Sequence, residues 1–287
     1  MNIYSSVDSK NIDKIIVLFY SCYINSSYKN KLKFYIITDE NYDEKNIKIP
    51  DIMHKIIEIK SVTFTDKWNS LLDDFNNNFY QGCTWCKNKM NFARFLFFET
   101  FPDVDRVVYL DWDMIVQEDI FQLINEYNSL ENMIVSKISD KSIFHNVFNL
   151  KFKGNIYFKN NNNIKSVTNQ LASNISKLTN TPHFCAGFYI VSKNHFDLDY
   201  LKNHITKLIE IQKKYKCFNF GTQSIMNLMH LDNRLYVDRL WNFTPEEDLI
   251  NKIKIIHWNG KDKPWKDKDI KRNEIWWSYQ AILDQFI

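Results

Sequence analysis

No apolar run in the 287-residue sequence is long enough to cross a membrane, because such a segment needs about 18 to 20 consecutive apolar residues. The first residues, Met1 to Ser6, do not combine a charged segment with an apolar one, so we expect no secretory signal peptide. The five cysteines are an odd number without regular spacing. The lone Cys83–Cys86 pair would suit a redox motif or half a zinc site, but it has no second pair. These absences favour a reducing, cytoplasmic location.

Arginine is also scarce, with 32 of the 37 basic residues being lysine and only five arginine. Abundant lysine, asparagine and isoleucine suggest an AT-rich genome, bacterial or viral. The formal net charge of +3 is too small to indicate nucleic-acid binding, and we expect no such partner. A hydrophobic share of 45% is typical of a globular chain that buries a core.

Apolar periodicity predicts strands that alternate with helices over residues 1–125. The predicted strands are Ile3–Val7, Lys33–Thr38, Lys55–Ile59 and a buried strand ending at Asp111 and Asp113, and the predicted helices are Ser9–Asn25, Asp66–Phe75 and Asn88–Thr100. This alternation indicates an α/β fold with a mostly parallel, doubly wound sheet. Ligands of such sheets bind outside the carboxyl ends of the strands. Asp8 follows the first strand, so we expect it on the same rim as Asp111 and Asp113.

The second half of the chain is predicted to be less regular. Residues 139–181 are polar and asparagine-rich, and we interpret them as an irregular insertion with a hairpin at Val147–Phe158. The other predicted elements are strands at Glu131–Lys137, Phe184–Ser192, Leu235–Asp238 and Lys254–His257, and helices at His195–Lys216, Gly221–His230 and Lys271–Phe286. No linker divides the chain, so residues 1–287 are predicted to form one domain, with residues 271–287 as a terminal helix.

The first candidate for chemistry is the pair of acids in Asp-x-Asp spacing. Side chains alternate along a strand, so Asp111 and Asp113 should face one way and Trp112 the other. Two carboxylates so close repel each other unless a cation lies between them. Oxygen ligands with open positions suit Mg²⁺ or Mn²⁺ holding a diphosphate. Taken alone, such a pair is as often a surface feature as a site.

The second candidate is the stretch from His257 to Trp265. His257 offers an imidazole ligand, Gly260 permits a close backbone approach to a phosphate, and Lys263 supplies a mobile positive charge. The alternative interpretation is a surface turn beside a buried tryptophan. Two uncommon motifs at the ends of separate strands favour a metal-dependent enzyme acting on a nucleotide diphosphate.

In this order along the chain, the motifs resemble those of the family 8 glycosyltransferases, which include glycogenin-like enzymes and bacterial lipooligosaccharide galactosyltransferases. The resembling segments are Val7–Asn11, Phe92–Phe95, Tyr109–Val116 with Asp119 and Ile120, Phe184–Gly187, Gly221–Asn227 and His257–Trp265. The resemblance implies a GT-A type fold, with residues 1–125 as the nucleotide-binding half and residues 126–270 as the half for the donor sugar and the acceptor.

The resemblance also implies roles for individual residues. Asp111, Asp113 and His257 would hold Mn²⁺ or Mg²⁺, with Asp111 also near the ribose. Asp8 and Asn11 would contact the nucleoside of a UDP-sugar, and Gly260 and Lys263 its diphosphate. Ala186, Gly187, Arg94 and Gln223 would lie against the donor sugar. The family retains anomeric configuration, and Gln223 is a candidate to stabilise the cationic sugar through its amide oxygen.

Three departures from the family's pattern bear on the sugar pocket. Cys185 replaces the usual asparagine beside Ala186, and Thr222 and Ser224 replace the acids that flank Gln223. The metal and diphosphate residues are intact, whereas the donor sugar is open. The acceptor would be a hydroxyl on a glycan, a lipid-linked sugar or a protein.

Three alternatives stay open. One is a catalytically weak or inactive relative that binds nucleotide sugars or glycans. Another is a metal-dependent phosphodiesterase or nuclease, which would need more carboxylates and histidines near the pair. A third concerns the end of the chain only: Trp276, Trp277 and Tyr279 would suit an acceptor sugar or peripheral contact with a membrane, although packing onto the domain is the favoured interpretation.

Overall fold

The structure is a computed structural model. It describes residues 1–43, 45, 47–78, 88–143, 161–171, 175–215, 217–218, 221–246 and 248–286. The predicted hairpin at Val147–Phe158 and the Cys83–Cys86 pair lie outside these residues. Within them, no helix is long and apolar enough to span a membrane.

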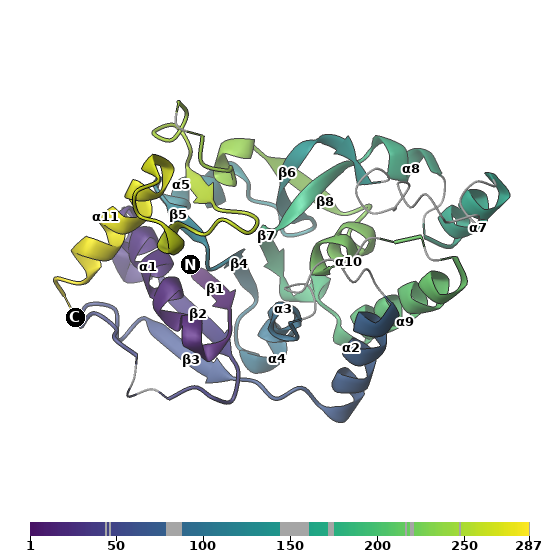
Figure 1. The fold of residues 1–287 in the computed structure, drawn as a ribbon, viewed down its shortest axis with the longest axis horizontal. Helices are drawn as coiled ribbons and strands as arrows, with labels where there is room; N and C mark the ends of the chain where they lie inside the picture. The colour runs from purple at the N-terminus through teal and green to yellow at the C-terminus, as the bar shows by residue number, and fades with distance from the viewer. Residues whose placement is uncertain are drawn as a thin grey trace.

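A seven-stranded sheet forms the centre of the fold, in the order β3-β2-β1-β4-β7-β6-β8 (Figure 1). The strands are β1 (Asn2–Ser6), β2 (Lys33–Thr38), β3 (Ile57–Ser61), β4 (Arg106–Leu110), β6 (Met133–Ser142), β7 (Pro182–Ser192) and β8 (Arg234–Val237). β7 runs antiparallel to both of its neighbours, β4 and β6, and the other four pairings are parallel. The mostly parallel sheet predicted from the sequence is confirmed.

A second, two-stranded sheet lies beside the first. It pairs β5 (Met114–Val116) with β9 (Ile255–His257) in antiparallel orientation. The connection from β4 to β5 is only three residues long, so the chain passes from one sheet to the other at Asp111, Trp112 and Asp113.

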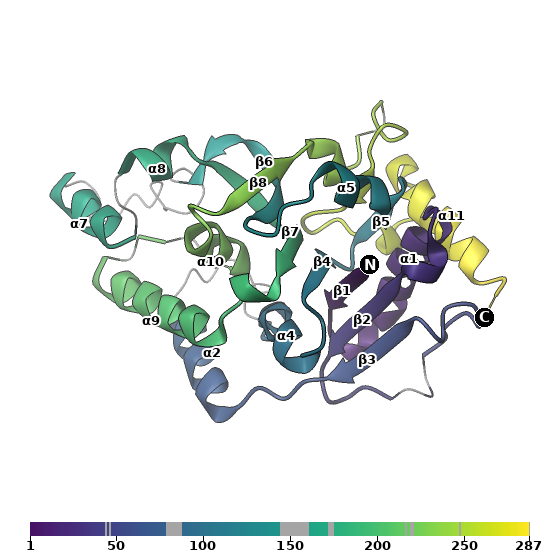
Figure 2. The same ribbon diagram turned by 180° about the vertical axis from the view of Figure 1, so that it is seen from behind.

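Helices cover both faces of the main sheet. They are α1 (Ile12–Ile24), α2 (Asp66–Asn78), α3 (Met90–Ala93), α4 (Phe97–Thr100), α5 (Ile120–Glu126), α7 (Asn161–Leu171), α8 (Ile175–Asn180), α9 (Leu198–Tyr215), α10 (Thr222–Met229) and α11 (Glu274–Leu283). α1 and α11 lie together at one end of the molecule, and α7 and α9 lie at the other, as both opposite views show (Figures 1 and 2). Side chains alternate along the strands and pack into two hydrophobic cores on opposite faces of the sheet. In β2, Phe34 and Ile36 belong to one core, and Tyr35 and Ile37 belong to the other.

Besides the strand that leads to the two acids, two predicted elements differ from the structure. The helix predicted over Asn88–Thr100 consists of α3, a 3-10 turn at Arg94–Leu96 and α4. The predicted irregular insertion at residues 139–181 contains the end of β6 and helices α7 and α8. Ile164, Val167 and Leu171 follow helical spacing, so the apolar residues of α7 prevail over its asparagine-rich composition.

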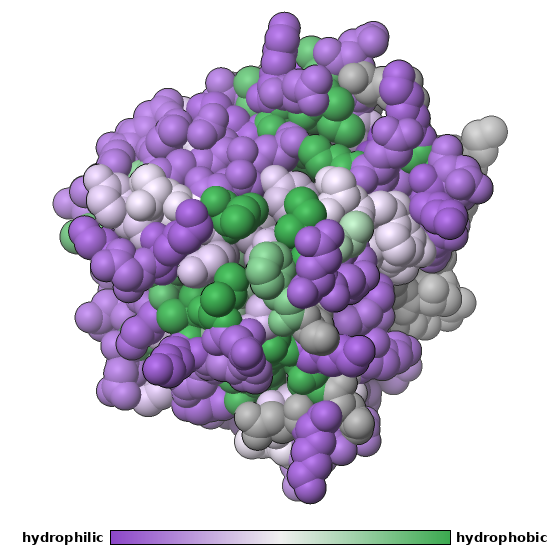
Figure 3. Space-filling view, turned by 90° about the vertical axis from the view of Figure 1, so that its left-hand side faces the viewer, coloured by the Kyte–Doolittle hydropathy of each residue, from purple (hydrophilic) through white to green (hydrophobic). Residues whose placement is uncertain are grey.

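The terminal helix α11 packs on the domain, as expected. Trp276 is fully buried, the Trp277 indole donates to the carbonyl of Pro264 at 3.0 Å, and the hydroxyl of Tyr279 accepts from Asn25 at 2.7 Å. Two apolar side chains nearby, Ile282 and Phe286, are 44% and 52% exposed. Figure 3 shows apolar surface among hydrophilic residues on this end of the molecule.

Candidate active site

Asp111 and Asp113 lie in a turn rather than in the predicted strand. β4 ends at Leu110 and β5 begins at Met114, so the alternation of a strand is not what brings the two carboxylates together. The turn is fixed at both ends, because the Asp111 amide donates to the carbonyl of Gly187 at 2.8 Å and the Trp258 amide donates to that of Asp113 at 3.0 Å. The two acids therefore sit where the two sheets meet.

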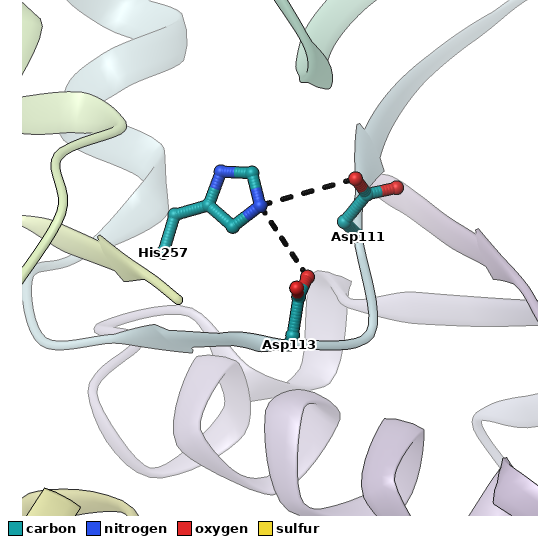
Figure 4. A group of neighbouring side chains, drawn as sticks. All are labelled: Asp111, Asp113 and His257. Atoms are coloured by element: carbon teal, nitrogen blue, oxygen red, sulfur yellow. Dashed lines mark ion pairs between the residues drawn. The ribbon is translucent and has the colours of Figure 1, made fainter. Parts of the chain in front are cut away.

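His257 reaches the acids because β9 pairs with β5. Its partner in the register is Met114, the residue directly after Asp113. His257 Nε2 lies 3.4 Å from Asp113 Oδ1 and 3.9 Å from Asp111 Oδ2 (Figure 4). One ligand atom from each of the three residues lies within 4.8 Å of the others, a grouping that is able to hold a metal ion.

Each acid is anchored through one oxygen and presents the other to the site. Asp111 Oδ1 accepts from the Tyr109 hydroxyl at 2.6 Å and from Arg94 Nη2 at 3.2 Å. Asp113 Oδ2 accepts from the ammonium of Lys263. Asp113 Oδ1 is buried and makes no well-formed hydrogen bond among the described residues, although His257 Nε2 lies 3.4 Å away. A buried carboxylate oxygen without a donor is costly, and a cation would satisfy it.

The electrostatics of the site also favour a cation. Burial alone would raise the pKa of Asp113, but His257 and Lys263 hold this pKa well below its usual range. Burial lowers the pKa of His257, yet the Asp113 carboxylate, followed by Cys185, raises it to about 10. A metal ion bound at Nε2 would take the place of that proton, because a ligating nitrogen must be unprotonated.

Gly187 leaves the space that such an ion needs. A Cβ built on this residue would lie 2.5 Å from His257 Cε1 and 2.7 Å from Asp111 Oδ2. Any larger residue would therefore push on two of the three candidate ligands. Glycine is required here for close approach and not for an unusual backbone angle.

Arg94 is buried behind Asp111. Its guanidinium donates to the carbonyls of Ala186 and Asn91 at 2.7 and 2.8 Å, contacts Asp111, and lies 4.5 Å from the centre of the Tyr109 ring. Burial alone would lower the pKa of Arg94, but Tyr109 and Asp111 raise it by a larger amount. The net pKa is therefore above its usual value, and the side chain stays charged. Contact between Arg94 and a donor sugar stays a prediction.

Gln223, Ala186 and Gly187 are brought together by β7 and α10. The Ala186 amide donates to Gln223 Oε1 at 3.2 Å, from the first turn of α10. The Gly187 carbonyl in turn accepts from the Asp111 amide. The predicted sugar-pocket residues thus form one connected group with Asp111, one of the candidate metal ligands.

Asp8 and Asn11 follow β1 at the carboxyl edge of the sheet. β1 is the parallel neighbour of β4, with Tyr4 opposite Tyr109, so Asp8 and Asp111 emerge from adjacent strand ends, as predicted. Asp8 Oδ2 accepts from Asn88 Nδ2 at 2.9 Å, and the Asn11 amide donates to the Asp8 carbonyl at 2.9 Å.

The loop after His257 is held against the acids by tryptophans. Trp265 stacks on Trp112 with ring centres 4.7 Å apart, and Lys263 also donates to the carbonyl of Trp258 at 2.9 Å. Gly260 has a φ of +118°, and nothing lies within 4 Å of a built Cβ. Glycine is therefore favoured here by the backbone conformation and not by a lack of space for a side chain.

Sequence reasoning missed two residues that contact the ligands. Tyr109 lies two positions before Asp111 and donates to it. This short separation in the sequence could have suggested the contact. Asn242 accepts from His257 Nδ1 at 2.9 Å across 15 residues of sequence. Nothing in the local sequence around Asn242 indicates that contact.

The sequence matches the model of glycosyl transferase family 8 over residues 2–269. It is 26% identical over 271 residues to glycosyltransferase 8 domain-containing protein 1 of Xenopus laevis, covering 88% of this chain and 71% of that relative. It is 23% identical to glycosyltransferase GlyE of Streptococcus pneumoniae, covering 91% of this chain but only 56% of GlyE.

Solved structures show the same fold. The galactosyltransferase LgtC, in a complex with donor and acceptor sugar analogues, superposes with a TM-score of 0.64 at 18% identity, over 99% of this chain and 96% of LgtC. The GlyE structure gives a TM-score of 0.57 at 18% identity, over 99% of this chain and 63% of GlyE. These neighbours have the GT-A fold. With a family model that spans nearly the whole sequence, the chain belongs to glycosyl transferase family 8.

Proposed function

We propose that this protein is a retaining glycosyltransferase that moves a sugar from a UDP-sugar to a hydroxyl of a glycan, a lipid-linked sugar or a protein. The proposal depends on Mn²⁺, or Mg²⁺ in its place, held by Asp111, Asp113 and His257. The observation that carries it is the convergence of these three ligand atoms within 4.8 Å, next to the ammonium of Lys263.

The residues present fit such an ion. Two carboxylates and one imidazole are a suitable donor set for Mn²⁺, Asp113 Oδ1 lacks a donor among the described residues, and Gly187 keeps the space beside two ligands clear. When bound, a divalent ion supplies positive charge for the diphosphate that leaves as the glycosidic bond to phosphate breaks.

The chain's own groups would do the rest of the work. Lys263 adds a second positive charge where the negative charge of the leaving group develops. The sugar passes through an oxocarbenium-like state, and Gln223 Oε1 is the candidate to stabilise it. The leaving phosphate accepts the proton of the acceptor hydroxyl, which attacks from the face that the diphosphate leaves, so no strongly basic residue is needed.

The specificity for the donor would lie in β7 and α10. Cys185, Thr222 and Ser224 are all buried, with exposed fractions of 5%, 8% and 6%. They replace an amide and two acids that are usual in the family, so fewer charged groups are available to bind sugar hydroxyls. This difference favours a donor sugar other than the one that those acids recognise.

The test is a panel of UDP-sugars with and without Mn²⁺, followed by UDP release. We expect metal-dependent turnover of one donor in the wild type and its loss in Asp113→Asn, which keeps the shape of the side chain but removes its charge. Tight UDP binding without turnover, whatever the acceptor, would instead identify a nucleotide-sugar binding protein. Digestion of plain nucleic acid would identify a nuclease.

A further inference from the structure

Asn242 contacts His257 at Nδ1, the ring nitrogen that does not face the two acids. It lies directly after the 3-10 turn Arg239–Trp241, and its own amide donates to the Arg239 carbonyl at 3.0 Å. The next residue, Phe243, is bonded twice to β9: its amide donates to the Ile255 carbonyl, and its carbonyl accepts from the His257 amide. The backbone thus fixes Asn242 and His257 relative to each other.

The contact between Asn242 and His257 determines which nitrogen of the imidazole carries a proton. Asn242 Oδ1 lies 2.9 Å from His257 Nδ1, and an amide oxygen is only an acceptor, so Nδ1 carries a proton. The Cys185 sulfur lies farther away, at 3.7 Å, and is a weak partner. With Nδ1 as the donor, Nε2 is the nitrogen that faces Asp111 and Asp113.

We propose that Asn242 is a positioning residue for the metal centre, which holds the His257 ring in place and keeps its proton on Nδ1 so that Nε2 is the ligating atom. This inference rests on the proposed function, because it requires that the three residues bind a metal ion. A hydrogen-bonded partner of this kind orients metal-binding histidines in general.

The surroundings of Asn242 agree with a role for its oxygen alone. The side chain is buried, and its Nδ2 has no hydrogen-bond partner among the described residues. An unsatisfied buried donor is destabilising, so if the bond from His257 did not matter, an apolar residue of similar size would pack here more favourably. The amide is best explained by the acceptor that it gives to His257.

The experiment compares Asn242→Leu, which removes the acceptor, with Asn242→Asp, which keeps it. Free Mn²⁺ is titrated into the full-length protein without nucleotide and followed by electron paramagnetic resonance, with thermal unfolding measured in parallel. We expect Asn242→Leu to weaken Mn²⁺ binding about 10- to 100-fold and Asn242→Asp to stay within about threefold of the wild type or to bind more tightly.

Asn273→Leu is the matched control. Asn273 is another buried asparagine that accepts from a ring nitrogen, here Trp258 Nε1 at 2.8 Å, but the ring is not a candidate ligand. This variant should lose stability and keep its affinity for Mn²⁺. A loss of affinity as large as that of Asn242→Leu would show that the effect is general to the loop and would overturn the inference.

Other outcomes also decide the question. Mn²⁺ binding by Asn242→Leu within twofold of the wild type would overturn the role of Asn242 and leave the proposed function intact. An equal loss in Asn242→Asp would do the same. A wild type that binds no Mn²⁺ would overturn both. If Asn242→Leu does not fold, imidazole ¹⁵N NMR of the Mg²⁺-loaded wild type replaces it, and a proton on Nε2 of His257 would overturn the inference.

Discussion

Substituting Gly187 by alanine is the sharpest test of the candidate metal site. The added Cβ would lie 2.5 Å from His257 Cε1 and 2.7 Å from Asp111 Oδ2. Carbon atoms in favourable contact are about 3.5 to 4.0 Å apart, so each neighbour must move by roughly 1 Å. Both neighbours are candidate ligands. A displacement of this size costs about 100-fold in rate when it misplaces a reacting group, and the overpacking should cost about 1–3 kcal/mol of stability.

Two measurements separate these effects. Mn²⁺ affinity by electron paramagnetic resonance and UDP release with the best donor should both fall about 100-fold in Gly187→Ala, while urea unfolding reports the smaller loss of stability. Gly260→Ala is the control for Mn²⁺ affinity, because Gly260 has open space but a φ of +118°, so this variant should cost the strain of one loop and leave the three candidate ligands in place. Turnover and Mn²⁺ affinity of Gly187→Ala within about threefold of the wild type would refute the assignment of the site.

Three further predictions concern charge, hydrogen bonding and pH. Lys263→Met should lower turnover about 100-fold across all donors, because the diphosphate loses a cation. A changed ranking of the UDP-sugars at a normal rate would contradict that role. Tyr109→Phe should weaken Mn²⁺ binding about tenfold in the same resonance assay, since a hydrogen bond to a charged group such as Asp111 contributes about 1.5–3 kcal/mol, and unchanged affinity would argue against it. Burial lowers the pKa of His230 to about 3, so below about pH 6.5 only the unfolded chain takes up this proton. The contribution of neutral His230 to the free energy of unfolding is therefore fully present above that pH and falls by about 1.4 kcal/mol per pH unit toward pH 3. Urea titrations at pH 7 and pH 5 should accordingly show a larger change in the free energy of unfolding for the wild type than for His230→Gln, whereas equal changes in both proteins would contradict the prediction.

The parts of the fold that follow from local patterns were predictable. β2 was placed to the residue because its apolar run is bounded by polar residues, and α1 and β9 were placed within a few residues of their ends. The parallel pairing of β1 with β2 follows from α1 between them. The antiparallel orientation of β7 has no such signal, because it depends on pairing with strands that are distant in the sequence.

The candidate ligands were identified for a partly incorrect reason. Alternation along a strand appeared to place Asp111 and Asp113 on one face, but the backbone turns between them. The apolar residues on both sides of the pair fit one strand or two equally well. Only the antiparallel pairing of β5 with β9 reveals the turn, and the sequence gives no sign of that long-range contact.

Short elements posed a different difficulty. The asparagines of α7 favour loops, so its composition predicted an irregular segment although three apolar residues follow helical spacing. In the predicted helix before β4, the 3-10 turn at Arg94 tightens the backbone where its guanidinium enters the site. The guanidinium there donates to the Ala186 carbonyl and to Asp111, which lie 92 and 17 positions away, and local patterns do not show these contacts.

The pairing of β5 with β9 restricts how this chain can change in length during evolution. Each strand has three residues, and His257 lies opposite Met114. Because side chains alternate, one inserted or deleted residue within β9 would turn the imidazole to the opposite face of the ladder. Asn251 and Lys252, just before Ile253, are exposed, so a change of length there need not reach the ladder. Homologous chains that keep the three candidate ligands should therefore vary in length there, and keep His257 at the same position in β9.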